Sequence, residues 1–467
     1  MFKSLLALLA AALATAAPAQ TPRPDQVEFR ALYKELVETN TTLSAGSCTL
    51  AAERMAARLR KAGFTDSELT LFSVPEHPKD GGLVAVLPGS DPKAKAILLL
   101  AHLDVVEARR ADWTRDPFTL IEEGGYFYGR GTTDDKSQAA IWTDSMARFR
   151  ASGYRPRHAI KMALTCGEES DGAFNGAQYL TEHKRALIDA GFALNEGGGG
   201  RLDAAGKPIA LAFQVGEKVY QDYTLEVTNP GGHSSQPVPE NAIYRLSAAL
   251  GKVGAYEFPV QFNDTTRAYF TRLALIQGGA AGAAMTALVA NPNDAAADRI
   301  VSADKQNHSL LRTTCVATRV DAGHANNALP QRATAIVNCR IFPGVPAARV
   351  QAALETAIAD PLVKVVPVTP PPSKSPAVPL DPKVYGPAEK LAAAFFPGVQ
   401  MLPFMDTGAS DAVWTTPAGI PTYGVPGIFD DADLGNIHGL NERIRVQSLY
   451  VGRDYLFRLI KLYADAE

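Results

Sequence analysis

Residues 96–104 read AILLLAHLD, an apolar run followed by a histidine and an aspartate. The apolar run from Ala96 to Ala101 has no polar alternation and is short, which predicts a buried strand. His102 and Asp104 follow it directly. Because ligands bind beyond the carboxyl ends of the strands in open α/β sheets, these two side chains lie where a site is expected.

Further short strands and a helix surround this stretch. Ile160–Leu164 (IKMAL) and Phe192–Asn195 predict two more buried strands. Asp134–Arg150 carries apolar residues at helical spacing and predicts a helix between the first two strands. Strands that alternate with helices predict an α/β domain, with a sheet flanked by helices, over residues 24–217. The same character resumes over residues 376–467.

The pattern changes between residues 218 and 370. Val219–Thr228 alternates like a half-exposed strand, and Thr313–Val320 together with Ala333–Ile341 predicts a hairpin. Strands and helices here no longer alternate regularly. We therefore expect an inserted α+β domain with one open sheet face.

Two segments in this part of the chain differ in composition from their surroundings. Gln277–Asp298 is rich in Gly and Ala, which fits either a packed helix of small residues or a mobile loop. Pro367–Pro382 is rich in proline, which predicts a stiff linker between the inserted domain and the last part of the chain.

Composition limits the classes of function. The chain has 467 residues, which is enough for two domains, and 46% of them are hydrophobic. The net charge is −3, so no basic footprint for nucleic acid is present. Residues 1–19 resemble a signal peptide, with Lys3, an apolar run and the small residues Ala17-Pro18-Ala19. The run is too short for a membrane anchor, which predicts a secreted or periplasmic protein.

Four cysteines are present, and none forms a CxxC metal motif. The predicted hairpin could place Cys315 opposite Cys339, so a disulfide there and two free thiols are both compatible with the sequence. Cys166 follows a predicted strand and precedes two glutamates. Because no histidine lies nearby to activate it, we interpret Cys166 as a small buried packing residue.

All but one of the potential metal ligands lie at or just after predicted strands. They occur in His102-Leu103-Asp104, in GRGTTDDK (129–136), in Gly167-Glu168-Glu169, in Asn195-Glu196 and in Ile437-His438-Gly439. Each has an ordinary explanation when it is taken alone, such as a helix cap for Asp134 or a solvated acidic turn for the glutamate pair. Together, two histidines and three carboxylates suit a carboxylate-bridged pair of divalent metals, and nitrogen ligands favour zinc. Such a pair activates water and polarises a carbonyl.

The sequence resembles the M20 metallopeptidases over nearly the whole chain after the leader. The motifs occur in the family's order: HLDVV (102–106), GRGTTDDK (129–136), GEES (167–170), NEGG (195–198), GGHSSQP (231–237), NALP (327–330), GASDA (408–412) and IHG (437–439). Within the family the sequence is most similar to the carboxypeptidase S and aminoacylase branch. The resemblance implies a zinc-peptidase-like catalytic domain (24–217 and 376–467) and an inserted lid or dimerisation domain (218–370).

The resemblance also implies roles for individual residues. Asp134 would bridge two zinc ions, His102 and Glu196 would complete one site, and Glu169 and His438 would complete the other. Glu168 would be the general base, and Asp104 would orient His102. The peptide bond between Asp134 and Asp135 would be cis.

Four residues carry substrate-related expectations, again from the resemblance. His233 would cross a homodimer interface and stabilise the developing oxyanion. Asn327, Arg340 and Ser410 match positions that bind the substrate, and a guanidinium such as that of Arg340 offers a fork for a carboxylate.

The sequence therefore predicts an exported dizinc hydrolase that cleaves amide bonds of small peptides, as a carboxypeptidase or dipeptidase. The alternative substrate class is N-acyl amino acids. A binding protein that kept the fold but lost turnover is a third hypothesis, and the presence of Glu168 and of every expected ligand argues against it.

Overall fold

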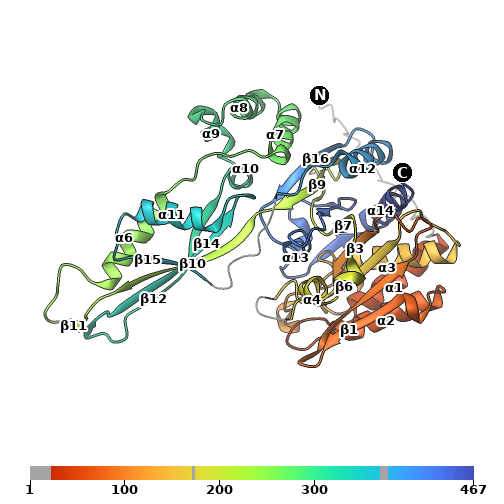
Figure 1. Ribbon diagram of the computed structural model, residues 1–467, viewed down its shortest axis with the longest axis horizontal. Coiled ribbons are helices and arrows are strands. Elements are labelled where there is room, and N and C mark those ends of the chain that lie inside the picture. The colour runs from red at the N-terminus through yellow and green to blue at the C-terminus, as the bar shows by residue number, and fades with distance from the viewer. Residues whose placement is uncertain (1–22, 171–173, 204, 369–376) are drawn as a thin grey trace, which may run out of the picture.

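A computed structural model describes residues 23–170, 174–203, 205–368 and 377–467. Two bodies make up the molecule: a large α/β domain and a smaller one that extends from it as an arm (Figure 1). The smaller body contains the described residues between 218 and 368 and is called the lid here. The predicted signal peptide and residues 369–376 of the predicted linker lie outside the described residues. No helix in the described part of the chain is long and apolar enough to cross a membrane.

The large domain is built on a mixed sheet of ten strands. In spatial order these are β1 (Leu69–Val74), β2 (His77–Leu87), β6 (Ile160–Thr165), β3 (Ile97–His102), β7 (Phe192–Asn195), β17 (Thr422–Gly424), β9 (Pro208–Glu217), β8 (Gly199–Leu202) and β18 (Phe429–Asp430), with β16 (Gln400–Asp406) paired to β9. The central strands β6, β3, β7 and β17 run parallel to one another. Every residue of β3 is buried, as expected for a central parallel strand.

Helices cover both faces of this sheet. One face packs against α1 (Pro24–Val37), α2 (Cys48–Lys61), α3 (Lys136–Ala151), α12 (Pro382–Phe395) and α14 (Val446–Ala464). The other face packs against α4 (Gly176–His183) and α5 (Arg185–Ile188), and α13 (Ala412–Thr415) lies against α4 and β17. A small sheet of β4 (Ile121–Glu123), β5 (Tyr126–Tyr128) and β19 (Arg443–Arg445) lies beside it. The predicted α/β fold with an inserted domain is confirmed.

The lid is an antiparallel sheet in the order β12 (Thr314–Ala322), β14 (Arg332–Ile341), β10 (Val219–Thr228) and β15 (Lys364–Pro367). Helices α6 (Ala242–Ala255) and α11 (Ala347–Ile358) pack on one face. The alternating burial along β10 shows that the other face is open. A short pair, β11 (Gly232–His233) with β13 (Ala328–Leu329), forms the far tip of the arm (Figure 1).

A helical insert joins the lid to the edge of the large sheet. It consists of α7 (Asp264–Gln277), α8 (Gly279–Ala290), α9 (Ala295–Val301) and α10 (Lys305–Leu310), and its apolar residues pack on β16. The small-residue segment Gln277–Asp298 therefore forms helices, and the mobile-loop alternative is wrong. Gly282 lies in α8 where α7 approaches so closely that a Cβ would stand 2.4 Å from the carbonyl oxygen of Ala274.

Two disulfides cross-link the described cysteines. Cys315 pairs with Cys339 across β12 and β14, in the register that the hairpin predicted. Cys166 is buried but bonds to Cys48, so its interpretation as a plain packing residue is wrong. The two cysteines are 118 residues apart, and only the packing of α2 beside the sheet brings them together. Two disulfides are typical of a protein that works outside the cytoplasm.

Candidate metal centre

The ligand candidates meet at the carboxyl edge of the central parallel strands. His102 is the last residue of β3, Glu168 and Glu169 follow β6, and Glu196 follows β7. Asp134 comes from the loop before α3, and His438 comes from the loop between β18 and β19. Because β6, β3 and β7 are neighbours in the sheet, residues far apart in sequence end at one place.

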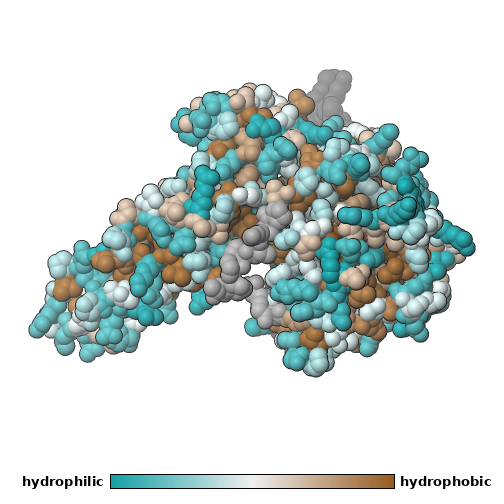
Figure 2. All heavy atoms as spheres, viewed as in Figure 1, coloured by the Kyte–Doolittle hydropathy of each residue, from teal (hydrophilic) through white to brown (hydrophobic). Residues whose placement is uncertain are grey.

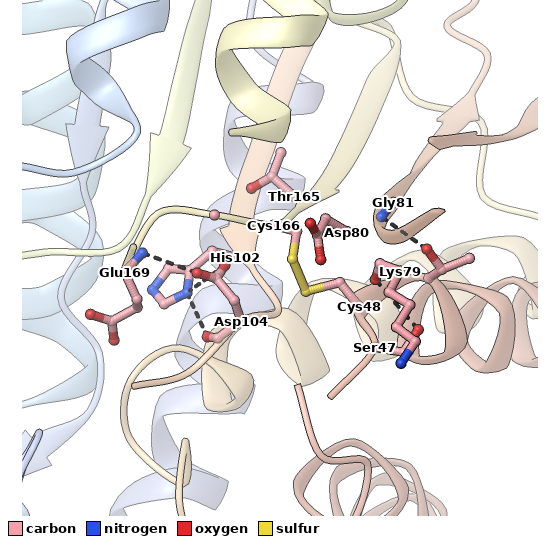
Figure 3. The surroundings of a disulfide bond; sticks show 12 residues. Ser47, Cys48, Lys79, Asp80, Gly81, His102, Asp104, Thr165, Cys166 and Glu169 are labelled. Atoms are coloured by element: carbon pink, nitrogen blue, oxygen red, sulfur yellow. Dashed lines mark hydrogen bonds and ion pairs between the residues drawn. A yellow bond between two sulfur atoms is a disulfide. The ribbon is translucent and has the colours of Figure 1, made fainter. Parts of the chain in front are cut away.

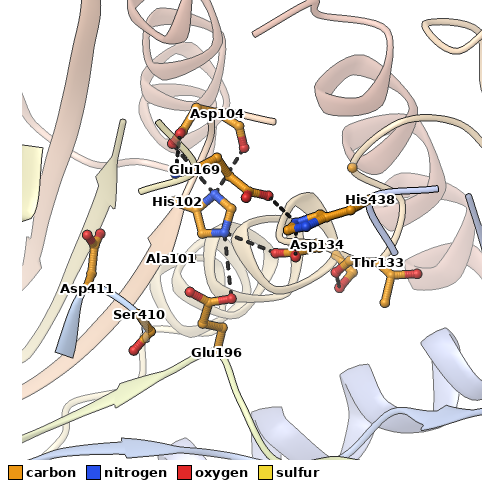
Figure 4. A network of polar contacts seen from close by, with 12 residues as sticks. Ala101, His102, Asp104, Thr133, Asp134, Glu169, Glu196, Ser410, Asp411 and His438 are labelled. Carbon is orange, nitrogen blue, oxygen red and sulfur yellow. Dashed lines mark hydrogen bonds and ion pairs between the residues drawn. The ribbon is translucent and has the colours of Figure 1, made fainter. Parts of the chain in front are cut away.

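Asp134 lies between the two histidines. Its Oδ1 is 3.1 Å from Nε2 of His102, and its Oδ2 is 3.2 Å from Nε2 of His438. A second carboxylate stands beside each histidine: Glu196 Oε2 is 3.6 Å from His102 Nε2, and Glu169 Oε1 is 2.9 Å from His438 Nε2 (Figure 4). One carboxylate with a separate histidine–glutamate pair on each oxygen is the arrangement of a bridged two-ion site.

Asp104 holds both His102 and the loop that follows β6. The His102 Nδ1 atom lies 3.0 Å from the backbone oxygen of Asp104 and 3.6 Å from its carboxylate. The backbone N–H of Glu169 donates to Asp104 Oδ2 at 3.0 Å. The ring therefore presents Nε2, and not Nδ1, to Asp134 and Glu196.

The loop that carries Asp134 is fixed by Glu442, which is buried. Glu442 accepts hydrogen bonds from the backbone N–H groups of Gly131, Thr133 and Asp134, and its carboxylate pairs with Arg130 at 2.7 Å. The peptide bond between Asp134 and Asp135 is cis, as the resemblance implies.

Glu442 and Asp411 are supporting residues whose roles the sequence does not predict. Asp411 accepts hydrogen bonds from Thr165 and Asn175, and so ties the end of β6 to the start of α4. The only sequence signal for either residue is its place beside a motif, Glu442 after IHG and Asp411 within GASDA.

Mutual repulsion and burial shape the electrostatics of the cluster. Burial, and next the charge of Glu196, raise the pKa of Glu168 to about 11. Burial likewise raises the pKa of Glu196 to about 7. Hydrogen bonds with Asp134 and Glu169 raise the pKa of His438 to about 10. The cluster holds more carboxylates than histidines, and divalent cations among them would relieve that imbalance.

The donor atoms also fit a pair of ions by their spacing. Ligand atoms of His102, Asp134 and Glu169 lie within 4.8 Å of one another, and so do those of His102, Glu168 and Glu196. The set combines imidazole nitrogen with carboxylate oxygen, which suits zinc and similar divalent ions.

Of the substrate-related candidates, only Ser410 lies beside this centre, where the side-chain amide of Asn195 donates to its hydroxyl at 3.2 Å (Figure 4). His233 lies at the tip of the lid, where its Nδ1 is 2.8 Å from the Ser235 hydroxyl, and the backbone of Asn327 pairs with that of Ser234. Arg340 lies near the base of the lid sheet, with its guanidinium over the ring of Tyr220. Ser410 is in the catalytic domain and is 7% exposed. Its hydroxyl donates to Glu217 at 2.9 Å.

A model of peptidase family M20/M25/M40 matches residues 98–462. The chain belongs to this family. Human N-fatty-acyl-amino acid synthase/hydrolase PM20D1 is 28% identical over 459 residues, which cover 95% of this chain and 89% of the human protein. Carboxypeptidase S of Saccharomyces cerevisiae is 28% identical over 273 residues, which cover 56% of this chain and 47% of the yeast protein.

Solved structures of the same family share the fold. An M20 metallo-carboxypeptidase from Sulfolobus solfataricus aligns with a TM-score of 0.67 at 18% identity, over 94% of this chain and 99% of that one. A dinuclear metal-binding M20 peptidase from Bacillus subtilis aligns with a TM-score of 0.58 at 14% identity, over 94% and 98% of the two chains. This protein is thus an M20 metallohydrolase, from a family with dinuclear metal-binding peptidases.

Proposed function

We propose that this protein hydrolyses the amide bond of small substrates that end in an amino acid carboxylate, with two zinc ions at the edge of the large sheet. The observation that carries the proposal is the position of Asp134 between two histidine–glutamate pairs. His102 and Glu196 would hold one ion, Glu169 and His438 the other, and Asp134 both. When bound, such ions make a shared water nucleophilic near neutral pH and polarise the scissile carbonyl.

Glu168 is the general base in this proposal. It takes a proton from the attacking water and delivers it to the nitrogen of the leaving amine. Its place in the loop after β6 supports this role, because a ligand atom of Glu168 lies within 4.8 Å of ligand atoms of His102 and Glu196. Asp104 keeps the His102 ring oriented throughout.

The first substrate class is small peptides with a free C-terminus, which a carboxypeptidase or dipeptidase cleaves. N-acyl amino acids are the second class, and the likeness to a human N-fatty-acyl-amino acid synthase/hydrolase over most of both chains favours it. Both classes contain an amino acid joined through its nitrogen to an acyl group. The basic side chain of Arg340 and the amide of Asn327 would bind the carboxylate, and Ser410 would add a hydrogen bond.

His233 would stabilise the oxyanion that forms on the substrate at the metal centre of a second copy of the chain. Its place at the far tip of the arm, away from the metal centre of its own chain, supports a role across an interface (Figure 1). Strand β12 is an edge of the lid sheet and exposes Val316 and Val320, which are 59% and 61% accessible. Hydrophobic residues also appear among hydrophilic ones along the arm in Figure 2. An exposed edge strand with apolar side chains is suited to pairing with another copy.

The compartment in this proposal is the periplasm or the exterior of the cell, reached by means of the signal peptide in residues 1–19. The two disulfides support it, because thiols in the cytoplasm are kept reduced.

The test is hydrolysis of a mixed panel of dipeptides, longer peptides with free C-termini and N-acyl amino acids. Each is assayed before chelation, after chelation and after zinc is added back. Cleavage that chelation removes and zinc restores supports the proposal, and the preferred substrate separates peptidase from deacylase. Cleavage that survives complete metal removal would overturn it.

A further inference from the structure

The Cys48–Cys166 disulfide lies directly behind the metal centre. Cys166 is the first residue after β6, two residues before Glu168 and three before Glu169. Cys48 is the first residue of α2, on the other side of the bond. Figure 3 shows the two sulfurs beside Asp104 and His102, and the sulfurs lie within 4.8 Å of a carboxylate oxygen of Asp104.

The loop that carries Glu168 and Glu169 is held from two sides. Toward the sheet, the Glu169 backbone N–H donates to Asp104, and the backbone of Gly167 hydrogen-bonds to the same carboxylate. Toward α4, the oxygen of Cys166 accepts from the Gly176 backbone at 2.7 Å. Toward α2, the disulfide supplies a covalent tie.

Cys48, the other half of the disulfide, lies at a well-fixed helix start. The side chain of Ser47 caps α2 by accepting a hydrogen bond from the Leu50 backbone, and the Ser47 backbone donates to Asn40. Both sulfurs are shielded, because Cys48 and Cys166 are 2% and 5% exposed. The disulfide therefore connects the loop with the two glutamates to a rigid, buried helix start.

We propose that the Cys48–Cys166 disulfide is a positioning element for catalysis, which holds Glu168 and Glu169 at their working places against Asp104. The enzyme would then reach full turnover only after this bond has formed in an oxidising compartment. The inference rests on the roles proposed above for the two glutamates. A misplacement of about 1 Å in a catalytic group lowers rates by up to about a hundredfold, so a loosened loop is enough for a large effect.

Breaking the bond needs two electrons and two protons and gives two thiols. A trialkylphosphine supplies the electrons: it is oxidised to the phosphine oxide, with water as the source of the oxygen and of both protons. The freed thiols would stand next to Asp104, whose Oδ1 has no hydrogen-bond partner among the described residues. Glu169 bonds to the other oxygen, Oδ2, so a thiol that donates to Oδ1 adds a new partner to the carboxylate that holds the loop.

The lid disulfide offers a matched control within the same chain. Cys315–Cys339 joins two neighbouring strands of the lid sheet, in a different domain from the metal centre. The double variant Cys48→Ala/Cys166→Ala is compared with Cys315→Ala/Cys339→Ala, both saturated with zinc and assayed well below their unfolding temperatures. We expect kcat to fall about tenfold or more in the first variant alone, with KM within twofold of the wild type. Equal kcat in the two folded variants would overturn the proposal.

A second measurement covers the case in which the first variant does not fold. Cys315→Ala/Cys339→Ala keeps two of the four cysteines, so Cys48–Cys166 is the one disulfide that can still form within the chain. The folded variant is reduced with phosphine until two thiols are counted, and kcat is measured before reduction, after it and after reoxidation. A fall that reoxidation reverses supports the proposal, and constant kcat with two free thiols overturns it. If chelation of the wild-type protein leaves turnover intact, the proposed function fails instead.

Discussion

The edge of the large sheet and the tip of the lid carry polar residues of similar kinds in very different surroundings. At the edge, His102 is 2% exposed and its ring nitrogens face the backbone of Asp104 on one side and two carboxylates on the other. At the tip, His233 is exposed, and its contact is with the neighbouring Ser235. The polar groups at the sheet edge already lie together on strand ends. The tip of the lid becomes a site only when a second chain, or another part of the same chain, comes against it.

This difference separates the two halves of the proposed reaction. The ends of adjacent parallel strands fix the groups that would hold ions and move a proton, and those groups need no further motion to meet. Of the groups that would bind the substrate or its oxyanion, all but Ser410 stand on the lid, so their contribution depends on a second chain or on movement of the lid.

The largest expected effect comes from a change at the metal centre. Glu168→Gln keeps the size of the side chain but removes its ability to accept a proton. We expect kcat to fall by about 10²–10⁴ while two metal ions stay bound, measured by steady-state kinetics and metal analysis. Glu182→Gln, at an exposed position on α4, is the matched control and should keep wild-type turnover. Undiminished turnover in Glu168→Gln would contradict the assignment of the base.

His233→Ala tests the proposed role of the lid tip. We expect kcat to fall by about 10²–10³, because one donor to the oxyanion is lost while the metal centre is untouched. His324→Ala, at an exposed lid histidine outside every motif, should behave as the wild type.

Mixing two inactive variants shows whether His233 acts across chains. A dimer of one Glu168→Gln chain and one His233→Ala chain has one site with both groups intact, if each chain completes the site of its partner. An equal mixture should therefore recover about a quarter of wild-type activity. No recovery in mixed dimers verified by mass would place His233 within its own chain's reaction or outside the reaction altogether.

The same contrast explains how much the sequence could predict. The strand ends, the helix after Asp134 and the lid strand Val219–Thr228 follow from hydrophobic periodicity, and the structure has them close to the predicted bounds. The contacts of His102 with Asp134 and Glu196 became predictable only through the order of the motifs. Parallel neighbours bring strand ends together, but periodicity alone does not say which strands are neighbours.

Other features depend on packing that no local pattern records. The Cys48–Cys166 bond requires α2 to lie beside the end of β6, across 118 residues. Glu442 accepts hydrogen bonds from three backbone N–H groups of the Asp134 loop. The residue types around Glu442 do not predict these hydrogen bonds. The segment Gln277–Asp298 stayed undecided because small residues form helices only when a partner such as α7 covers them.

Glu217, at the junction between the large domain and the lid, gives a prediction about stability and pH. Glu217 ends β9 on the catalytic side, is buried, and accepts a hydrogen bond from Ser410. Burial raises its pKa to about 8, well above its value in an unfolded chain. The folded state therefore holds the proton more tightly, so this group makes the protein less stable as the pH rises from about 4.5 to about 8.

Glu217→Gln should remove this loss of folding stability at higher pH. Between pH 6 and pH 7.5 we expect the stability of the variant relative to the wild type to rise by about 2 kcal/mol, measured by urea unfolding. Glu182→Gln is again the control, since an exposed carboxylate on α4 should give no such trend. A difference that does not change with pH would mean that Glu217 is ionised in the folded protein.

The smallest expected effect lies at the base of the lid. Arg340→Ala should raise KM about tenfold and leave kcat within twofold for substrates with a free carboxylate, because a contact made equally before and during the reaction contributes only to binding. Arg332→Ala is the matched control, since Arg332 begins the same strand at the end nearer the tip and pairs with Glu226. For substrates with an amidated C-terminus, wild type and Arg340→Ala should have equal KM values. If Arg340→Ala and Arg332→Ala behave alike on all substrates, Arg340 does not bind the carboxylate, and its recognition falls to Asn327 or to the catalytic domain.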